Sequence, residues 1–151
     1  MSAEIAPEYR PRPERGVVGY VPGAWDMFHI GHLNVLRRAR EKCDYLIVGV
    51  VTDEALFRAK RKYPIVPFDE RCEIVASIGI VDEVVTDFSS SKLDVWRRVP
   101  FDVVFKGDDW KGTPKGDELE HDMGSVGVEV HYFPYTQQTS STELRRIITE
   151  M

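Results

Sequence analysis

The chain of 151 residues lacks the features that mark several large classes of protein. It has only two cysteines, Cys43 and Cys72. They stand in no metal-type spacing and no signal-peptide pattern precedes them, so we expect reduced, packed thiols in a cytoplasmic protein. No apolar run approaches the length of a membrane span. With 25 acidic against 20 basic residues and a net charge of −5, the chain also does not suit a general nucleic-acid binder, whose phosphate contacts need a basic face.

Familiar catalytic signatures are missing as well. The sequence contains no Walker-type phosphate loop, no Gly-x-Ser-x-Gly nucleophile and no quartet of cysteines and histidines for zinc. Nothing therefore indicates a covalent intermediate or a metal centre held by the protein alone. The hydrophobic content of 42% suits one globular domain with a core. We assign that domain to residues 16–151 and interpret residues 1–15, which are polar and contain Pro7, Pro11 and Pro13, as a flexible N-terminal arm.

The most specific pattern that is present lies in residues 23–32, which read GAWDMFHIGH. His29 and His32 are three residues apart, a spacing that directs both side chains the same way on a helix. They stand between a short β-branched run and an amphipathic helical pattern, so we expect them where a helix begins. Such an end attracts anions through its unpaired N–H groups and its dipole. Two imidazole donors added there predict a polyphosphate site, whereas Asp26 and the histidines have no recognisable further partner for zinc.

Apolar patterns divide the rest of the chain into alternating strands and helices. Nearly continuous apolar runs predict strands that are buried on both faces of a parallel sheet, and apolar residues three and four apart predict amphipathic helices. We expect strands at 17–21, 45–51, 81–85, 101–105 and 127–133, and helices at 30–42, 52–59, 68–78, 92–99 and 140–148. This alternation predicts an α/β protein with a single-domain, doubly wound parallel sheet of the Rossmann-like kind, which binds its ligand at the carboxyl ends of the strands.

Further polar groups follow predicted strands or open predicted helices. Residues 106–110, KGDDW, offer an aromatic ring and carboxylates that either accept hydrogen bonds from a ribose or base or hold a hydrated Mg²⁺ by one contact. An Asx turn beside an exposed tryptophan has the same composition. Residues 139–142, TSST, offer a second anion site or ordinary helix caps. Residues 60–62, KRK, form a basic loop that either closes over a triphosphate or is simply solvated. Arg71 suits a bidentate phosphate contact and, equally, a surface ion pair.

Taken together, these residues resemble the HxGH nucleotidyltransferase superfamily and, within it, the small cytidylyltransferases of the glycerol-3-phosphate cytidylyltransferase type. The resemblance covers about residues 17 to 149. It rests on residues 23–26 and 29–32, Thr52-Asp53-Glu54, Arg71, Val81-Asp82-Glu83-Val84, Gly107-Asp108-Asp109-Trp110 and Ser140-Ser141-Thr142. The superfamily has a HUP-type Rossmann-like fold, and the aspartates before Trp110 favour the cytidylyltransferase branch.

The resemblance also implies roles for individual residues. His29 and His32 would stabilise charge on the phosphates in the transition state, with Lys60 of the basic loop as a third catalytic residue. Arg71 would hold the acceptor phosphate. The nucleotide would be bound by Gly23, Ala24 and Trp25 through their backbone, and by Lys62, Gly107, Asp108, Trp110, Thr136, Ser140, Ser141 and Thr142. Either Lys60 or Lys62 matches the lysine of the family's flexible loop.

The activity implied is transfer of CMP from CTP to a small alcohol phosphate, with glycerol 3-phosphate as the expected acceptor and a CDP-alcohol and pyrophosphate as products. Mg²⁺ is expected with CTP, and a homodimer is expected from the resemblance alone. Two positions depart from the pattern: Ala24 stands where the family commonly has Thr or Ser, and Tyr135 stands where it has an arginine. Two other functions stay open, an adenylyltransferase that uses ATP and a catalytically silent nucleotide-binding module.

Overall fold

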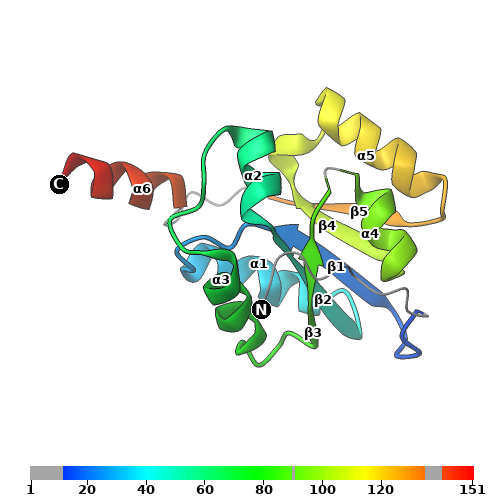
Figure 1. The fold of residues 1–151 in the computed structure, drawn as a ribbon. Coiled ribbons are helices and arrows are strands. Elements are labelled where there is room, and N and C mark those ends of the chain that lie inside the picture. Colours follow the sequence, from blue (N-terminus) through cyan, green and yellow to red (C-terminus); the bar gives the residue numbers. More distant parts are fainter. Residues whose placement is uncertain (1–11, 90, 135–140) are drawn as a thin grey trace.

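The computed structural model describes residues 12–89, 91–134 and 141–151, and its centre is a five-stranded β-sheet in the order β3-β2-β1-β4-β5 (Figure 1). All neighbouring strands are parallel. The strands are β1 (Val18–Gly23), β2 (Tyr45–Val51), β3 (Glu83–Asp87), β4 (Val103–Gly107) and β5 (Glu129–Phe133). The chain builds outward from β1 to β3 and then returns to place β4 on the other side of β1. This switch between β1 and β4 is where such a sheet opens its ligand crevice.

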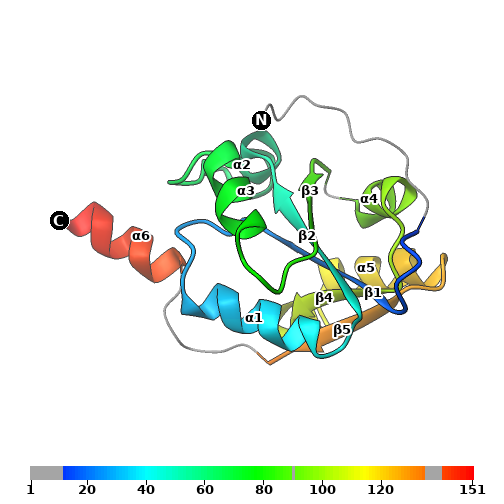
Figure 2. The ribbon, with the colours of Figure 1, turned by 90° about the horizontal axis from the view of Figure 1, so that it is seen from below.

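Helices cover both faces of the sheet, so the predicted doubly wound α/β fold is confirmed (Figure 1, Figure 2). α1 (Ile30–Arg40) and α3 (Phe68–Ala76) pack on one face, and α4 (Lys92–Arg98) and α5 (Pro114–Gly124) pack on the other. α2 (Asp53–Lys60) follows the carboxyl end of β2. Val48 of β2 lies in the core under α1 and α3, and its neighbour Ile47 lies in the opposite core. Both side chains are fully buried, as expected of a strand covered on both faces.

The last helix, α6 (Ser141–Glu150), extends away from the body of the domain in both views (Figure 1, Figure 2). Ile147 and Ile148 in its second half are 45% and 47% exposed. Its contacts with the body come instead from Ser141 and Arg145, at its beginning. Across the part of the chain that the structure describes, no helix is long and apolar enough to cross a membrane.

α5 lies in residues for which the apolar pattern predicts no element. Leu119 and Met123 are the large apolar residues that it buries, and a single pair four residues apart is too little to form a recognisable stripe. Its start nevertheless carries standard signals. Thr113 Oγ1 accepts the N–H of Gly116 at 3.1 Å, and Pro114 occupies the first turn.

Two predicted boundaries concern the start of β3 and the end of the N-terminal arm. β3 covers Glu83–Asp87 rather than 81–85, because Val81 still belongs to the turn after α3, where its N–H is bonded to the carbonyl of Ile78. Residues 1–11 of the predicted flexible arm lie outside the described residues. Arg12, also assigned to that arm, donates from Nε to Oδ1 of Asp102 at 2.9 Å, and this contact holds the pKa of Asp102 below its ordinary value.

Candidate active site

A pocket of about 360 Å³ opens at the carboxyl edge of the sheet, beside the switch between β1 and β4. Its lining includes most of the residues predicted for the site, namely Gly23, Ala24, Trp25, His29, His32, Lys60, Gly107, Ser141 and Thr142. Four others are described but do not line it, namely Lys62, Arg71, Asp108 and Trp110. Thr136 and Ser140 lie outside the described residues. Segments far apart in the sequence therefore meet where the sheet topology predicts a ligand site.

His29 and His32 cap α1 with their own side chains. Nδ1 of His29, the N-cap residue, accepts the N–H of Gly31 at 3.0 Å, and Nδ1 of His32 accepts the N–H of His29 at 3.3 Å. This is the reciprocal arrangement of a capping box, with two imidazoles in place of the usual hydroxyl and carboxylate. The two rings stack with their centroids 3.9 Å apart. The predicted pairing of these side chains at a helix start is confirmed.

The capping bonds determine where each imidazole carries its proton. A neutral imidazole has one N–H, and because each Nδ1 accepts a backbone hydrogen bond, the proton lies on Nε2. Burial lowers the pKa of His29 from its ordinary value of 6.5, and burial together with the neighbouring His29 lowers the pKa of His32 to about 4. Both rings are therefore neutral at pH 7, and each has a single donor that is free of the capping role.

Ser141, the first residue of α6, lies at the meeting point of these donors. Its Oγ is 3.4 Å from Nε2 of His29 and 3.5 Å from Nε2 of His32. The same hydroxyl donates to the backbone carbonyl of Asp26 at 2.6 Å. The start of α6 adds a second positive helix end to that of α1. Two helix starts thus converge on one position suited to a phosphate oxygen.

The loop between β1 and α1 has an uncommon backbone conformation. Trp25 and Met27 have φ angles of 56° and 51°, in the left-handed region that residues with side chains rarely adopt. Trp25 is anchored by a hydrogen bond from its Nε1 to the carbonyl of Gly49 at 2.9 Å. Its ring is 5% exposed and belongs to the core. This leaves its backbone for the nucleotide contact that the family resemblance implies.

Asp26 joins this loop to the segment that follows α2. Its Oδ2 and Oδ1 accept the N–H groups of Ile65 and Val66 at 2.9 Å and 2.8 Å. Arg145 of α6 lies 3.4 Å from Oδ2. The carboxylate is therefore a structural clamp rather than a free ligand. Among residues 12–89, 91–134 and 141–151, no group of three histidines, cysteines or carboxylates is placed to hold a metal ion.

Arg71 corrects the predicted site, because the structure does not bring it to the pocket. Its side chain is fully buried. Nε donates to the carbonyl of Val66 at 2.9 Å, Nη1 donates to the carbonyls of Ala24 and Val51 at 2.6 Å and 2.8 Å, and Nη2 donates to Asp53 at 2.5 Å. With no exposed surface, Arg71 has no face to offer an acceptor phosphate. It holds the β1–α1 loop and the end of β2 against α3, and its ion pair is internal rather than at the surface.

Three cationic side chains line the pocket, Lys60 at the end of α2, Arg38 of α1 and Lys106 of β4. Of the two lysines that match the family's loop lysine, Lys60 is the one that lines the pocket. Sequence reasoning leaves Arg38 and Lys106 unassigned. The signal for Arg38 is its spacing, since it lies seven residues after Gly31 of the histidine motif and therefore on the same face of α1. The signal for Lys106 is its place directly before Gly107, at the carboxyl end of a buried strand.

Trp110 and Asp108 belong to a short 3₁₀ turn, Asp108–Trp110, directly after β4. The ring of Trp110 packs against the core under α4 and α5. Nζ of Lys106 lies over this ring, 3.8 Å from its centroid. Asp108 is exposed. The nucleotide contacts expected of these two residues stay a prediction.

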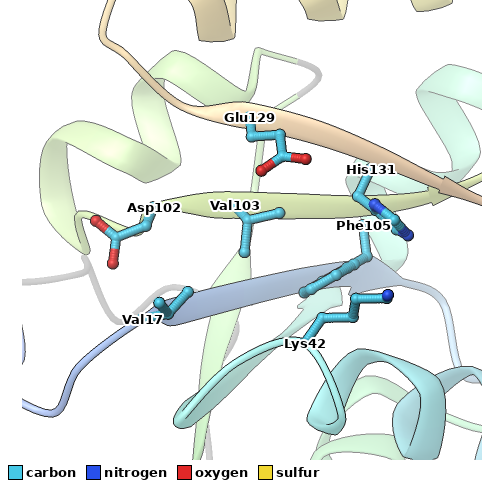
Figure 3. Close-up of a pocket in the computed structure, with 7 residues that line it drawn as sticks. All are labelled: Val17, Lys42, Asp102, Val103, Phe105, Glu129 and His131. Carbon is cyan, nitrogen blue, oxygen red and sulfur yellow. The ribbon is translucent and has the colours of Figure 1, made fainter.

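A second cavity, of about 320 Å³, lies at the opposite, amino edge of the sheet (Figure 3). It is surrounded by side chains from the first halves of β4 and β5, from the residue before β1 and from a residue two positions after the end of α1. Its lining consists of Val17, Lys42, Asp102, Val103, Phe105, Glu129 and His131. None of these residues is predicted for the site, and parallel sheets of this kind bind ligands at the carboxyl edge. The pocket at the histidines is therefore the candidate active site.

The fold and the paired imidazole donors define an α/β protein whose pocket is suited to phosphate groups. A family model described as cytidylyltransferase-like matches residues 20–147, so the chain belongs to this family of nucleotidyltransferases. Glycerol-3-phosphate cytidylyltransferase from Bacillus spizizenii is 34% identical over 125 residues, which are 82% of this chain and 91% of the relative. FAD synthase from Pyrococcus horikoshii is 34% identical over 140 residues, 91% of each chain. Ethanolamine-phosphate cytidylyltransferase from Arabidopsis thaliana is 36% identical over 138 residues, which are 88% of this chain but only 32% of the relative.

Solved structures agree with the fold. The lipopolysaccharide core biosynthesis protein from Thermoplasma volcanium superposes with a TM-score of 0.68 and 20% identity, over 82% of this chain and 99% of that one. Pantothenate synthetase from Thermus thermophilus gives a TM-score of 0.65 and 17% identity, over 88% of this chain and 62% of that one. At these identities the likeness shows the fold alone, and it confirms the expected HUP-type, Rossmann-like class.

Proposed function

We propose that the protein transfers CMP from CTP to a small alcohol phosphate, with glycerol 3-phosphate as the first acceptor, and releases a CDP-alcohol and pyrophosphate. The observation that carries this proposal is the pair of neutral imidazoles, whose Nε2 atoms both lie within 3.5 Å of Ser141 Oγ. Donors that are oriented before substrate arrives suit a reaction in which charge grows on phosphate oxygens. The Bacillus spizizenii relative, matched over 91% of its length, supports the choice of substrates.

This reaction needs no nucleophile from the protein. An oxygen of the acceptor phosphate attacks the α-phosphorus of CTP and forms a new P–O bond. The bond from that phosphorus to the oxygen bridging to the β-phosphate breaks, and its electron pair leaves with pyrophosphate. Catalysis then consists of positioning and charge stabilisation. His29 and His32 donate to the oxygens that gain charge, Lys60 neutralises the triphosphate, and Ser141 holds a phosphate at the start of α6.

Mg²⁺ enters the proposal as part of the substrate, MgCTP. The described residues around the histidines offer no cluster of carboxylates. The carboxylate of Asp26 is already occupied by two backbone amides. We therefore expect the ion on the triphosphate oxygens, with water completing its shell, which is a coordination that Mg²⁺ commonly adopts.

The test replaces each imidazole by a side chain that still caps the helix but lacks the Nε2–H donor. Asparagine is a good N-cap residue, so His29→Asn retains an acceptor for the N–H of Gly31. Glutamine at the third helical position completes a capping box, so His32→Gln retains an acceptor for the N–H of His29. Each variant loses the oriented Nε2–H donor. We expect kcat for pyrophosphate release to fall by about 10²- to 10³-fold in each, with little change in melting temperature.

The matched control is His121→Asn, because His121 is exposed on α5, away from the pocket lining. It should leave both kcat and the melting temperature near those of the wild type. Near-normal turnover in both His29→Asn and His32→Gln would remove the donors from the mechanism. A large fall in melting temperature would show instead that the replacement caps had failed, and phosphate binding by the folded fraction would then be compared directly.

A second candidate function is adenylyl transfer from ATP. FAD synthase from Pyrococcus horikoshii matches over 91% of both chains. The imidazole pair is suited to phosphate oxygens, which CTP and ATP share. Pyrophosphate release measured in parallel with the two nucleotides separates the candidates. A higher kcat/KM with ATP than with CTP for every acceptor would replace the first proposal by the second.

Binding of CTP without turnover would indicate a catalytically silent nucleotide-binding module. Calorimetry with CTP, followed by a release assay with glycerol 3-phosphate, other polyol phosphates, phosphoethanolamine and phosphocholine, covers that case. We also propose, on family resemblance, that the protein is a homodimer. Sedimentation equilibrium should then give twice the mass of the chain.

A further inference from the structure

Lys106 lines the pocket from the carboxyl end of β4, but it has no structural partner of the usual kind. Its Nζ lies 3.8 Å from the centroid of the Trp110 ring. In the described part of the chain its ammonium makes no ion pair with a carboxylate. An aromatic face attracts a cation but does not neutralise it. Lys106 therefore resembles a binding group more than a structural one.

Two carboxylates, Asp109 and Asp87, act on the charge of Lys106, but neither forms an ion pair with it in the described part of the chain. Asp87 is buried and paired with Lys92: its Oδ2 accepts from Tyr20 at 2.7 Å and from Lys92 at 2.8 Å, while its Oδ1 has no hydrogen-bond partner among the described residues. Asp109 raises the pKa of Lys106. Burial, followed by the like charge of Lys92, lowers the pKa of Lys106 to about 8, so most of the lysine is still charged at pH 7. An anion that entered the pocket would supply the missing counter-charge.

The acceptor phosphate is the part of the proposed reaction without an assigned cation. Arg71 is buried and engaged with three carbonyls and a carboxylate. Position 135, where the family has an arginine, is a tyrosine here. Among the described cations that line the pocket, Arg38 is on α1 with the histidines and Lys60 ends α2, whereas Lys106 enters from β4.

The pocket also offers no available carboxylate. Asp26 is the acidic residue in its described lining, and both of its oxygens accept backbone N–H groups. A cationic head group would therefore meet Lys60 and Lys106 with nothing to pair it, and like charges in a partly buried site repel strongly.

We propose that Lys106 binds the acceptor's phosphate and that the pocket selects phosphate monoesters whose head group is uncharged or anionic, in preference to phosphoethanolamine or phosphocholine. This inference rests on the proposed function, since it concerns the second substrate of that reaction. It assigns the specificity for the acceptor to a residue outside the histidine motif.

The test separates the KM for the acceptor from the KM for CTP. Lys106→Met removes the charge and keeps much of the stem, so the acceptor KM should rise about 10- to 100-fold, which corresponds to one charge-assisted contact, while the KM for CTP changes by less than about twofold. Lys106→Arg should restore most of the acceptor binding. Lys115→Met is the matched control, because Lys115 lies near the same Trp110 ring, at 5.8 Å, but does not line the pocket.

A binding experiment keeps the inference testable if the wild type shows no turnover. Calorimetry then measures glycerol 3-phosphate, inorganic phosphate and phosphoethanolamine against the wild type and the three variants, with CTP present. Loss of phosphate binding in Lys106→Met but not in Lys115→Met supports the inference even if the proposed reaction fails. Equal binding by Lys106→Met and wild type, a raised KM for CTP alone, no phosphate binding by the wild type, or phosphoethanolamine binding as tightly as glycerol 3-phosphate each overturns it.

Discussion

Substitution of Arg71 distinguishes a structural role from a phosphate-binding role. The buried guanidinium donates to three carbonyls and to Asp53. Arg71→Met keeps most of the apolar stem but leaves all four acceptors without their partner. Removing one member of a buried charge pair costs about 3–5 kcal/mol. Because Asp53 is 30% exposed and water can reach it, we expect a loss near the lower end, about 3 kcal/mol.

In a domain of 151 residues, that loss should lower the melting temperature by about 6–12 °C. Urea unfolding provides the free energy, and thermal unfolding provides the temperature. Arg71→Lys should fall between the wild type and Arg71→Met, since one ammonium group cannot reach acceptors on several sides. Arg97→Met is the control, because Arg97 is 59% exposed and its pair with Asp94 should be worth less than about 0.5 kcal/mol.

The opposite pattern would refute this reasoning. If Arg71 contacts the acceptor phosphate, Arg71→Met should melt within about 2 °C of the wild type while its acceptor KM rises about tenfold or more. That result would require the guanidinium to leave its buried position in the working enzyme.

Three further tests concern the pH dependence of stability, the hydrogen bonds of Asp26 and the close packing of Gly49 against Tyr20. The pKa of His32 is about 4 in the folded chain against 6.5 ordinarily, so the unfolded chain takes up the proton first as the pH falls from 6.5. The free energy of unfolding should therefore fall by about 2–3 kcal/mol more in the wild type than in His32→Gln between about pH 7 and pH 4, measured by urea titration. Asp26→Asn should lower the free energy of unfolding by about 1–3 kcal/mol and accelerate hydrogen exchange at the N–H groups of Ile65 and Val66. Unchanged exchange at these two amides would contradict the structural role of Asp26. Gly49→Ala places a Cβ 1.9 Å from the Tyr20 hydroxyl, so we expect a loss of about 1–3 kcal/mol; a melting temperature equal to that of the wild type would contradict the crowding.

The strands and the histidine site were predictable because their signals are local. β2 is a continuous apolar run, and a run of that kind has few alternatives to a buried parallel strand. The spacing of His29 and His32 determines that they face the same way at a helix start. Switch-point topology then places the loops that follow β1 and β4 at one edge, which is why Gly107 and the histidines meet in one pocket.

The remaining features depend on contacts that sequence spacing does not encode. Nothing in the residues around Arg71 shows that carbonyls from three separate segments surround it, so a phosphate contact and a structural contact have the same sequence pattern. α5 packs with too few large apolar residues to show a stripe. The role proposed for Lys106 rests on the absence of an ion pair with a carboxylate. That absence can be seen only once the neighbouring elements are in place.

The reciprocal cap at the start of α1 has a consequence for how a nucleotide enters. Because each Nδ1 is held by a backbone amide, neither ring can change tautomer unless the first helical turn opens. A triphosphate therefore meets donors that need neither rotate nor exchange a proton with solvent. The two imidazoles should then contribute no proton exchange with the buffer when CTP binds near pH 7, and fraying of one helical turn would remove both oriented donors together.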